Sequence, residues 1–274
     1  MFYEITAIYT IMDDTLKAMR HQEDPRRTFS DAEVLTTALV ASRFFSGHLN
    51  RARLFLQQTG LMPKMISESR FNRRWHALSN LLLNIFEYLG YCLKQQNQSQ
   101  QYLLDSFPLE VCDNIRIRRC RLLQGEDYRG YCAAKRRYFY GLRVHVVTTS
   151  EGIPVELAFL PGEANDSRGL SVLSLELPQG SEVFMDAGYT DYQAEDDALA
   201  AEGLRLSVGR KKNSTRRDQW GEHWYKKMTR HRIETVFSEI TSWFPKRIHA
   251  VTLEGFLLKA TLFVFAFALS KAFI

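Results

Sequence analysis

The sequence carries few of the signals that assign a chain to a class directly. It has only four cysteines, Cys92, Cys112, Cys120 and Cys132, with no C-x-x-C pair and no histidines at zinc-finger intervals. We therefore expect free thiols in a reducing cytoplasm. The first residues, MFYEITAIYTIMDD, have no basic start and no cleavage site, so no signal peptide is expected. The most apolar run, Thr261 to Leu269, is shorter than the roughly 20 residues that cross a bilayer, and it predicts a buried core helix and no membrane partner.

The composition is that of a soluble globular protein with a basic cluster. The chain has 274 residues, 45% of them apolar and 24% charged, which is enough for one large domain or two of ordinary size. The formal net charge is +5, and nine Lys or Arg lie between Arg210 and Arg232, against two acids, Asp218 and Glu222. Such a cluster favours a polyanionic partner, most often nucleic acid. For one cluster alone, a solvated basic face is the simpler explanation.

The first third of the sequence has helical periodicity. Residues 1–20 can form an amphipathic helix. A capping-box pattern at Ser30 and Glu33 opens a second helix that ends near Gly47, and a shorter helix is expected over residues 49–58.

A third long helix is expected from near Ser67 to about Leu89, with Arg70, Arg73 and Arg74 on its first turns. Three successive helices with arginines at the start of the last resemble a helix-turn-helix DNA reader. The alternative is a helical packing module with exposed arginines. The polar stretch that follows, residues 95–101, is typical of a linker. The sequence thus predicts a helical DNA-binding domain over 1–94, a linker over 95–101 and a second domain over 102–274.

The second domain begins with a short apolar run, Tyr102 to Leu104, followed by Asp105. Such a run predicts a core strand. A carboxylate inside or at the end of a buried strand costs free energy unless it has a partner. A hard divalent cation bound by the carboxylate would be such a partner and would make a catalytic site possible. The alternative is a turn-initiating aspartate before Ser-Phe-Pro.

A second carboxylate follows another apolar strand further along the chain. Residues 138–149 alternate between apolar and polar faces and predict a strand, and a second strand is expected over 153–160. Asp166 is expected to be the N-cap of a helix rather than a metal ligand. The run Val183 to Met185 then predicts a strand that ends in Asp186. A helix over 191–202 and a strand over 204–208 follow.

The last helix of this series, from about Met228 to Phe244, contains two candidate acids. Its apolar residues recur every three or four positions, and Glu234 lies at the edge of that apolar face. Glu239 points well away, because five residues at about 100° each carry it around the helix. Glu234 is therefore the better-placed acid, and a surface ion pair with Arg230 is its alternative role.

These elements together resemble the DDE transposases of bacterial insertion sequences, which have a ribonuclease H-like catalytic domain. The resemblance is carried by LLDSFPLEVC, YFYGLRVHVVTTSEGIPVELAFLPGEANDSRGL, VFMDAGYTDY and RHRIETVFSEI. The stretches TFSDAEVLTTAL and SESRFNRRW are similar to the insertion-sequence family numbered nine-eight-two. The fold implied is α/β, a mixed sheet flanked by helices and preceded by an all-α N-terminal domain.

The resemblance implies a catalytic and metal-binding triad of Asp105, Asp186 and Glu234. Asp105 would bridge two Mg²⁺ ions, for which Mn²⁺ could substitute, and each of the other two acids would complete one shell. The implied reaction cleaves the ends of the element and joins the freed 3′-hydroxyl to target DNA. The tyrosine-arginine-glutamate-lysine signature of some relatives fits only at Arg230, since Lys227 and Thr241 stand at its tyrosine and lysine positions.

The implied partner is double-stranded DNA, both element ends and target, bound by a homodimer without a nucleotide cofactor. Phosphate contacts are expected from Arg70, Arg73, Arg74, Arg210, Lys211, Lys212, Arg216, Arg217, Lys226, Lys227 and Arg230. Trp220 and Trp224 could stack on a flipped base, or form an aromatic pair packed on the core.

Two other functions fit the same sequence features. One is a metal-dependent nuclease without strand transfer, which the same fold would serve. The other is a catalytically silent DNA-binding regulator, against which the three intact acids argue.

Overall fold

The structure is a computed structural model that describes residues 1–132, 136–211, 213–218 and 220–274. Contacts divide the chain into two compact units. The first unit is formed by Met1–Leu89 together with Trp243–Ile274, and the second by Gly90–Ser242. All three predicted catalytic acids belong to the second unit.

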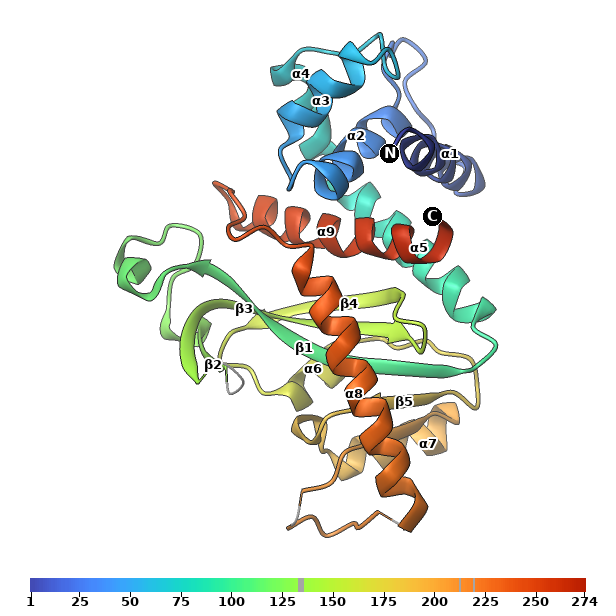
Figure 1. The fold of residues 1–274 in the computed structure, drawn as a ribbon, viewed down its shortest axis with the longest axis vertical. Helices are drawn as coiled ribbons and strands as arrows, with labels where there is room; N and C mark the ends of the chain where they lie inside the picture. Colours follow the sequence, from blue (N-terminus) through green and yellow to red (C-terminus); the bar gives the residue numbers. More distant parts are fainter. Residues whose placement is uncertain (133–135, 212, 219) are drawn as a thin grey trace. The chain divides into compact units, whose positions relative to one another are not determined.

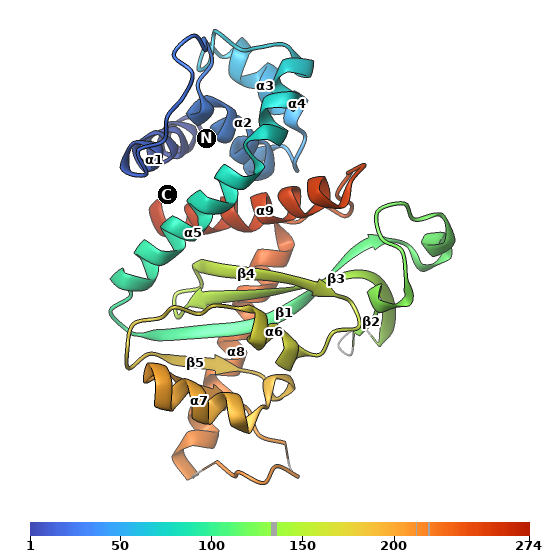
Figure 2. The ribbon, with the colours of Figure 1, turned by 180° about the vertical axis from the view of Figure 1, so that it is seen from behind.

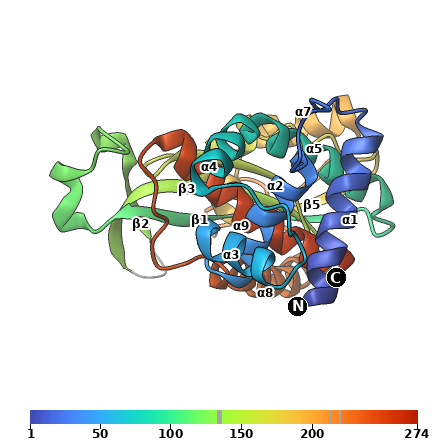
Figure 3. The same cartoon turned by 90° about the horizontal axis from the view of Figure 1, so that it is seen from above.

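The first unit is helical and is built around α2. It contains α1 (Phe2–Ala18), α2 (Asp31–Phe44), α3 (Leu49–Gln58), α4 (Glu68–Ala77), the first part of α5 (Ser79–Gln96) and α9 (Leu253–Phe273). α2 contacts α1, α3, α4 and α9, and almost all of its side chains are buried (Figure 3). The predicted capping box is confirmed, because Ser30 accepts from the Glu33 N–H while Glu33 accepts from the Ser30 N–H.

α9 forms part of the core of the first unit. By length and composition it is the one helix among the described residues that is apolar enough to cross a membrane, but 67% of its apolar window is buried inside the protein. Phe265 packs edge-on against Phe86, and Phe263 packs against Phe244. The core helix expected from the sequence is therefore present. It packs with the N-terminal helices, whereas the predicted domain boundaries placed it in the catalytic domain.

The long helix expected from Ser67 to Leu89 is two helices, and this expectation was wrong. α4 ends at Ala77, Leu78 is its C-cap residue and bonds through its N–H to the Arg74 carbonyl, and α5 begins at Ser79. α5 then continues through Gln96, into the stretch predicted to be a linker. Lys94 explains this, because its buried ammonium bonds to Glu156 at 2.7 Å and to the Leu175 carbonyl at 2.6 Å. A buried charge held by two partners fixes the end of the helix.

The second unit contains a mixed six-stranded sheet with the order β2-β3-β1-β5-β6, and β4 pairs with β3. The strands are β1 (Gln101–Cys112), β2 (Arg129–Cys132), β3 (Arg137–Thr149), β4 (Pro154–Pro161), β5 (Glu182–Met185) and β6 (Arg205–Val208). β1 pairs antiparallel with β3 and parallel with β5. Short 3-10 turns η1 (Asn114–Arg119), η2 (Glu126–Tyr128) and η3 (Ala187–Tyr189) follow β1 and β5. The α/β class predicted from the sequence is confirmed, and the arrangement is consistent with a ribonuclease H-like fold.

Helices cover both faces of this sheet. α8 (Trp220–Ser242) crosses one face in Figure 1, while α6 (Asp166–Val172) and α7 (Tyr192–Glu202) lie on the opposite face in Figure 2. The core under α6 and α7 includes Tyr102, Leu104, Val183 and Met185. Because strand side chains alternate, the intervening residues of β1 and β5 point toward α8.

Candidate active site

Asp105 lies in the middle of β1 rather than at its end. The strand continues through Pro108 to Cys112, paired with β3 on one edge, while its pairing with β5 on the other edge ends at Leu104. An unpaired edge tolerates proline, which explains why Ser-Phe-Pro does not end the strand. The Asp105 carboxylate is half-buried and accepts the Ser106 N–H at 2.7 Å. The turn-initiating role is therefore excluded for Asp105.

The register of the parallel pair places Asp186 next to Asp105. Leu104 pairs with Met185, so Asp105 and Asp186 directly follow a paired position on two neighbouring strands. Neighbouring strands lie about 4.8 Å apart in a sheet. Asp186 leaves the strand in an extended conformation and caps η3 by accepting the Ala187 N–H at 2.7 Å. Both acids thus stand at the point where the parallel pairing ends.

α8 brings Glu234 to the same face. Phe107, two residues after Asp105 and therefore on the same side of β1, packs edge-on against Phe237 of α8 with ring centroids 6.4 Å apart. Phe184, two residues before Asp186, packs in the same way against Tyr225 at 5.3 Å. Glu234 lies between these two contacts along the helix. Packing on both sides thus orients the helix that carries the third acid.

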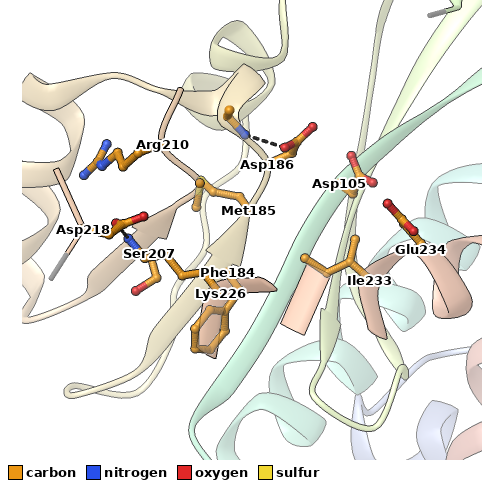
Figure 4. Close-up of a pocket in the computed structure, with 12 residues that line it drawn as sticks. Asp105, Phe184, Met185, Asp186, Ser207, Arg210, Asp218, Lys226, Ile233 and Glu234 are labelled. Carbon is orange, nitrogen blue, oxygen red and sulfur yellow. Dashed lines mark hydrogen bonds and ion pairs between the residues drawn. The ribbon is translucent and has the colours of Figure 1, made fainter. Parts of the chain in front are cut away.

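The three acids line one pocket of ≈ 190 Å³, shown in Figure 4. In that view the carboxylates of Asp105, Asp186 and Glu234 approach one another from β1, the end of β5 and α8. The pocket has room for several water molecules or for a phosphate group, since one water needs about 10–15 Å³. Among the described residues, no three Asp, Glu, His or Cys side chains are clustered tightly enough to hold a metal ion. The donors nevertheless fit a hard divalent cation, because all three supply carboxylate oxygens.

Several predicted DNA-binding residues are engaged in ion pairs around this pocket. The Arg210 guanidinium donates to both oxygens of the buried Glu195, at 2.7 Å for one of them. Arg216 pairs with Asp196 at 2.7 Å, and Lys226 pairs with Asp218 at 2.6 Å. These hydrogen bonds raise the pKa of Arg210 and of Arg216. The three side chains hold the basic segment onto the sheet and α7, and a role in binding DNA stays a prediction for them.

The remaining predicted DNA contacts of the basic cluster fall into two groups. Lys211 and Arg217 are exposed, and so is Trp224, whose side chain is 65% exposed and therefore not packed on the core. Lys212 lies outside the described residues, as do the side chains of Trp220, Lys227 and Arg230. α8 begins at Trp220, earlier than the expected Met228.

The arginines of the first unit have different environments. Arg70 and Arg73 are exposed on α4 and line an open depression with Arg26 and Arg27. Arg74 instead donates to Asp31 and to the Phe29 carbonyl, and it pairs with Glu23 at 3.2 Å. Arg74 is thus structural in this unit, whereas Arg70 and Arg73 have the exposure that a phosphate contact needs.

A polar cluster that the sequence did not indicate lies behind Asp105, on the α6 face of the sheet. His145 is fully buried, and its Nδ1 atom lies 2.8 Å from the Tyr189 hydroxyl. Ser106 donates to Asp166 at 2.8 Å. Asp166 is the first residue of α6, and Asn165 occupies the N-cap position without a side-chain cap, so the N-cap role expected of Asp166 is wrong.

This polar cluster is connected to both acids of the strands. Ser106 adjoins Asp105 in the chain, and the Tyr189 N–H bonds to the Asp186 carbonyl at 3.0 Å. The cluster therefore supports the backbone of both acids.

Burial sets the titration of this cluster. It lowers the pKa of His145 to about 4, an effect that the Asp166 charge opposes and the Arg143 charge reinforces. Burial, with the charges of Asp105 and Asp166, raises the pKa of Tyr189 well above its usual value. Both groups are therefore neutral near pH 7. The only sequence signal was His145 on the polar side of an alternating strand, which gave no sign that a helix covers it.

Comparison with known proteins identifies the second unit. The family model described as transposase DDE domain matches residues 95–246, which is 152 of the 274 residues. The matched region contains all three acids that line the pocket. No curated protein and no solved structure matches the chain.

Proposed function

The chain belongs to the transposase DDE domain family, and on this premise we propose that it cleaves the ends of an insertion sequence and joins them to target DNA. The observation that carries the proposal is the shared pocket of Asp105, Asp186 and Glu234, three acids that the chain brings together from distant segments. Membership of the family numbered nine-eight-two is part of the proposal and rests on sequence resemblance alone.

The proposed site would hold divalent metal ions, Mg²⁺ or Mn²⁺, through Asp105, Asp186 and Glu234. Such ions, when bound, supply Lewis-acid stabilisation of the attacking and leaving oxygens. The chain itself contributes a fixed backbone for two of the acids, since Ser106 and Ala187 each donate a backbone N–H to the preceding carboxylate. Ile233 and Phe184 give the pocket an apolar wall that limits the water around the carboxylates.

The proposed reaction has two steps at this one site. Water attacks the phosphorus at the element boundary, the bond from phosphorus to the 3′-oxygen breaks, and a 3′-hydroxyl and a 5′-phosphate are released. The 3′-hydroxyl then attacks a target phosphodiester and displaces another 3′-oxygen, so no ATP is consumed. Exposed basic residues would bind DNA phosphates, namely Lys211 and Arg217 near the site and Arg70 and Arg73 in the first unit.

The test uses the purified chain, Mg²⁺ and a duplex that carries the natural flanking DNA, together with a supercoiled target plasmid. We expect a nick at the element boundary and joined products in the plasmid. Asp105→Asn should abolish both while leaving a gel shift intact, and Glu239→Gln, on the exposed side of α8, should cleave normally. Nicking without joined products would favour the nuclease alternative. Full cleavage by the Asp105→Asn variant would refute the site.

A further inference from the structure

A basic arm extends from the far end of β1. We define the arm as residues 113–128, which connect β1 to β2 and include η1 and η2. Figures 1, 2 and 3 all show it projecting beyond the strands of the sheet. The part 113–121 carries the exposed arginines Arg116, Arg118, Arg119 and Arg121. Its only acid is Asp113, which lies 3.9 Å from Arg116.

The arm is an anchored structure rather than a loose loop. The buried Tyr140 hydroxyl donates to the carbonyls of Leu123 and Gly125, at 3.3 and 3.0 Å. Leu123 is itself buried, and Asn114 donates its side-chain amide to the Tyr138 carbonyl at 2.9 Å. These bonds fix the arm to β3 at two points. The arginines are thus presented from a fixed position on the same sheet that holds Asp105.

The arm also carries an exposed apolar side chain. Ile115 is 92% exposed and stands next to Arg116 in η1, a turn with no buried residue. The four like charges repel one another, a polyanionic partner would relieve this repulsion, and covering Ile115 would add apolar burial on binding. A polyanion with apolar surface between its charges satisfies both groups. Duplex DNA has this chemistry, because phosphates flank grooves that expose thymine methyl groups and base steps.

β1 sets the distance between the arm and the acids. Cys112 is seven residues beyond Asp105, which at about 3.3 Å per residue is roughly 23 Å along the strand. The same length of B-DNA contains about seven base pairs. We propose that the arm binds duplex DNA about seven base pairs from the cleaved phosphodiester, with its arginines on phosphates and Ile115 against the bases. This assignment rests on the proposed function, since the acids define the cleaved position.

The first test measures binding of the full chain to a duplex several helical turns long, in EDTA so that cleavage plays no part. Each lost phosphate contact should reduce by about 0.9 the steepness with which the logarithm of the association constant falls against the logarithm of the salt concentration. The double variant Arg118→Ala with Arg119→Ala should therefore reduce this slope by about 1.8. Arg168→Ala removes another exposed arginine, in α6 on the face of the sheet away from α8, and should leave the slope unchanged. Ile115→Ser should weaken binding roughly tenfold. Val251→Ser, at an equally exposed position, should not.

The second test locates the contact. Replacing Ile115 with the photocrosslinker p-benzoylphenylalanine should give a crosslink to DNA about seven base pairs from the nick. A crosslink to a second copy of the chain, or none to DNA, would overturn the assignment. If the parent chain binds DNA and the arm variants show its full salt slope, the arm proposal fails while the proposed function stands. If the parent nicks no end DNA but the arm crosslinks to DNA, the proposed function fails instead.

Discussion

The Nδ1 atom of His145 lies 2.8 Å from the hydroxyl oxygen of Tyr189, in the core behind the pocket acids. The other ring nitrogen of His145 has no hydrogen-bond partner among the described atoms. Tyr189 also closes the turn that begins at Asp186. This one hydrogen bond therefore links β3 to the backbone that carries the second acid.

Tyr189→Phe should remove that bond and leave His145 without any partner in the core. A buried unpaired polar group costs about 1–3 kcal/mol, and we expect the free energy of unfolding to fall by that amount in urea titrations. Tyr138→Phe, at an exposed position of β3, is the matched control and should change stability by less than about 0.5 kcal/mol. Equal stabilities of the two variants would contradict the structural role of the bond.

Gly169→Ala should be destabilising because α6 packs directly on His145. A Cβ atom at position 169 would overlap the imidazole ring of His145, which is fully buried. We expect a loss of about 1–3 kcal/mol. Gly221→Ala should instead raise the free energy of unfolding, by up to about 1 kcal/mol. A Cβ atom there meets nothing within 4 Å, and alanine favours the helix over glycine. Thermal unfolding of the two variants measures both effects.

His145 should make stability depend on pH. Its pKa is lowered to about 4 in the folded chain from 6.5, so between these values the unfolded chain binds more protons. The contribution to stability is complete above pH 6.5 and is lost as the pH falls toward 4, by up to about 3 kcal/mol. His145→Gln, which cannot titrate, should flatten the pH dependence of the urea midpoint in this window. An unchanged slope would show that other groups cause it.

Asp31→Ala should unfold the first unit more easily. The buried Asp31 carboxylate bonds to His21 at 3.0 Å and to Arg27 at 2.8 Å, and it also accepts from Arg74. Burial alone would raise its pKa, but the hydrogen bonds of His21 and Arg74 and the charge of Arg27 hold that pKa below the usual value. Removing the carboxylate leaves two arginines without their common partner, which costs about 3–5 kcal/mol. Asp24→Ala, which breaks the exposed pair with Arg26, should cost less than about 1 kcal/mol.

The sequence predicted the parts of the site that depend on local pattern. Apolar runs that end in a carboxylate indicated β1 and β5, and helical spacing distinguished Glu234 from Glu239. The pairing of Leu104 with Met185, which sets Asp105 beside Asp186, has no local signal. Nor does the continuation of β1 through Pro108, because it depends on which edge of the strand is unpaired.

Tertiary contacts decide the features that sequence reasoning missed. No glycine or proline stands near Leu78, yet the chain turns there between α4 and α5. Lys94 looks like a surface residue in a polar stretch and is instead buried against Glu156. The identity of the helix that covers His145, and of the acids that neutralise Arg210 and Arg216, likewise follows from the assembled sheet rather than from nearby residues.

The central claim is that Asp105, Asp186 and Glu234 hold divalent metal ions together. Electron paramagnetic resonance titration of the full chain with Mn²⁺, in the presence of end DNA, counts the bound ions directly. The account predicts that Glu234→Gln binds Mn²⁺ at least tenfold more weakly than the parent chain, because it removes a ligand charge. The same titration of Glu239→Gln, an acid on another side of α8, should match the parent. Equal Mn²⁺ affinity in all three proteins would contradict the account.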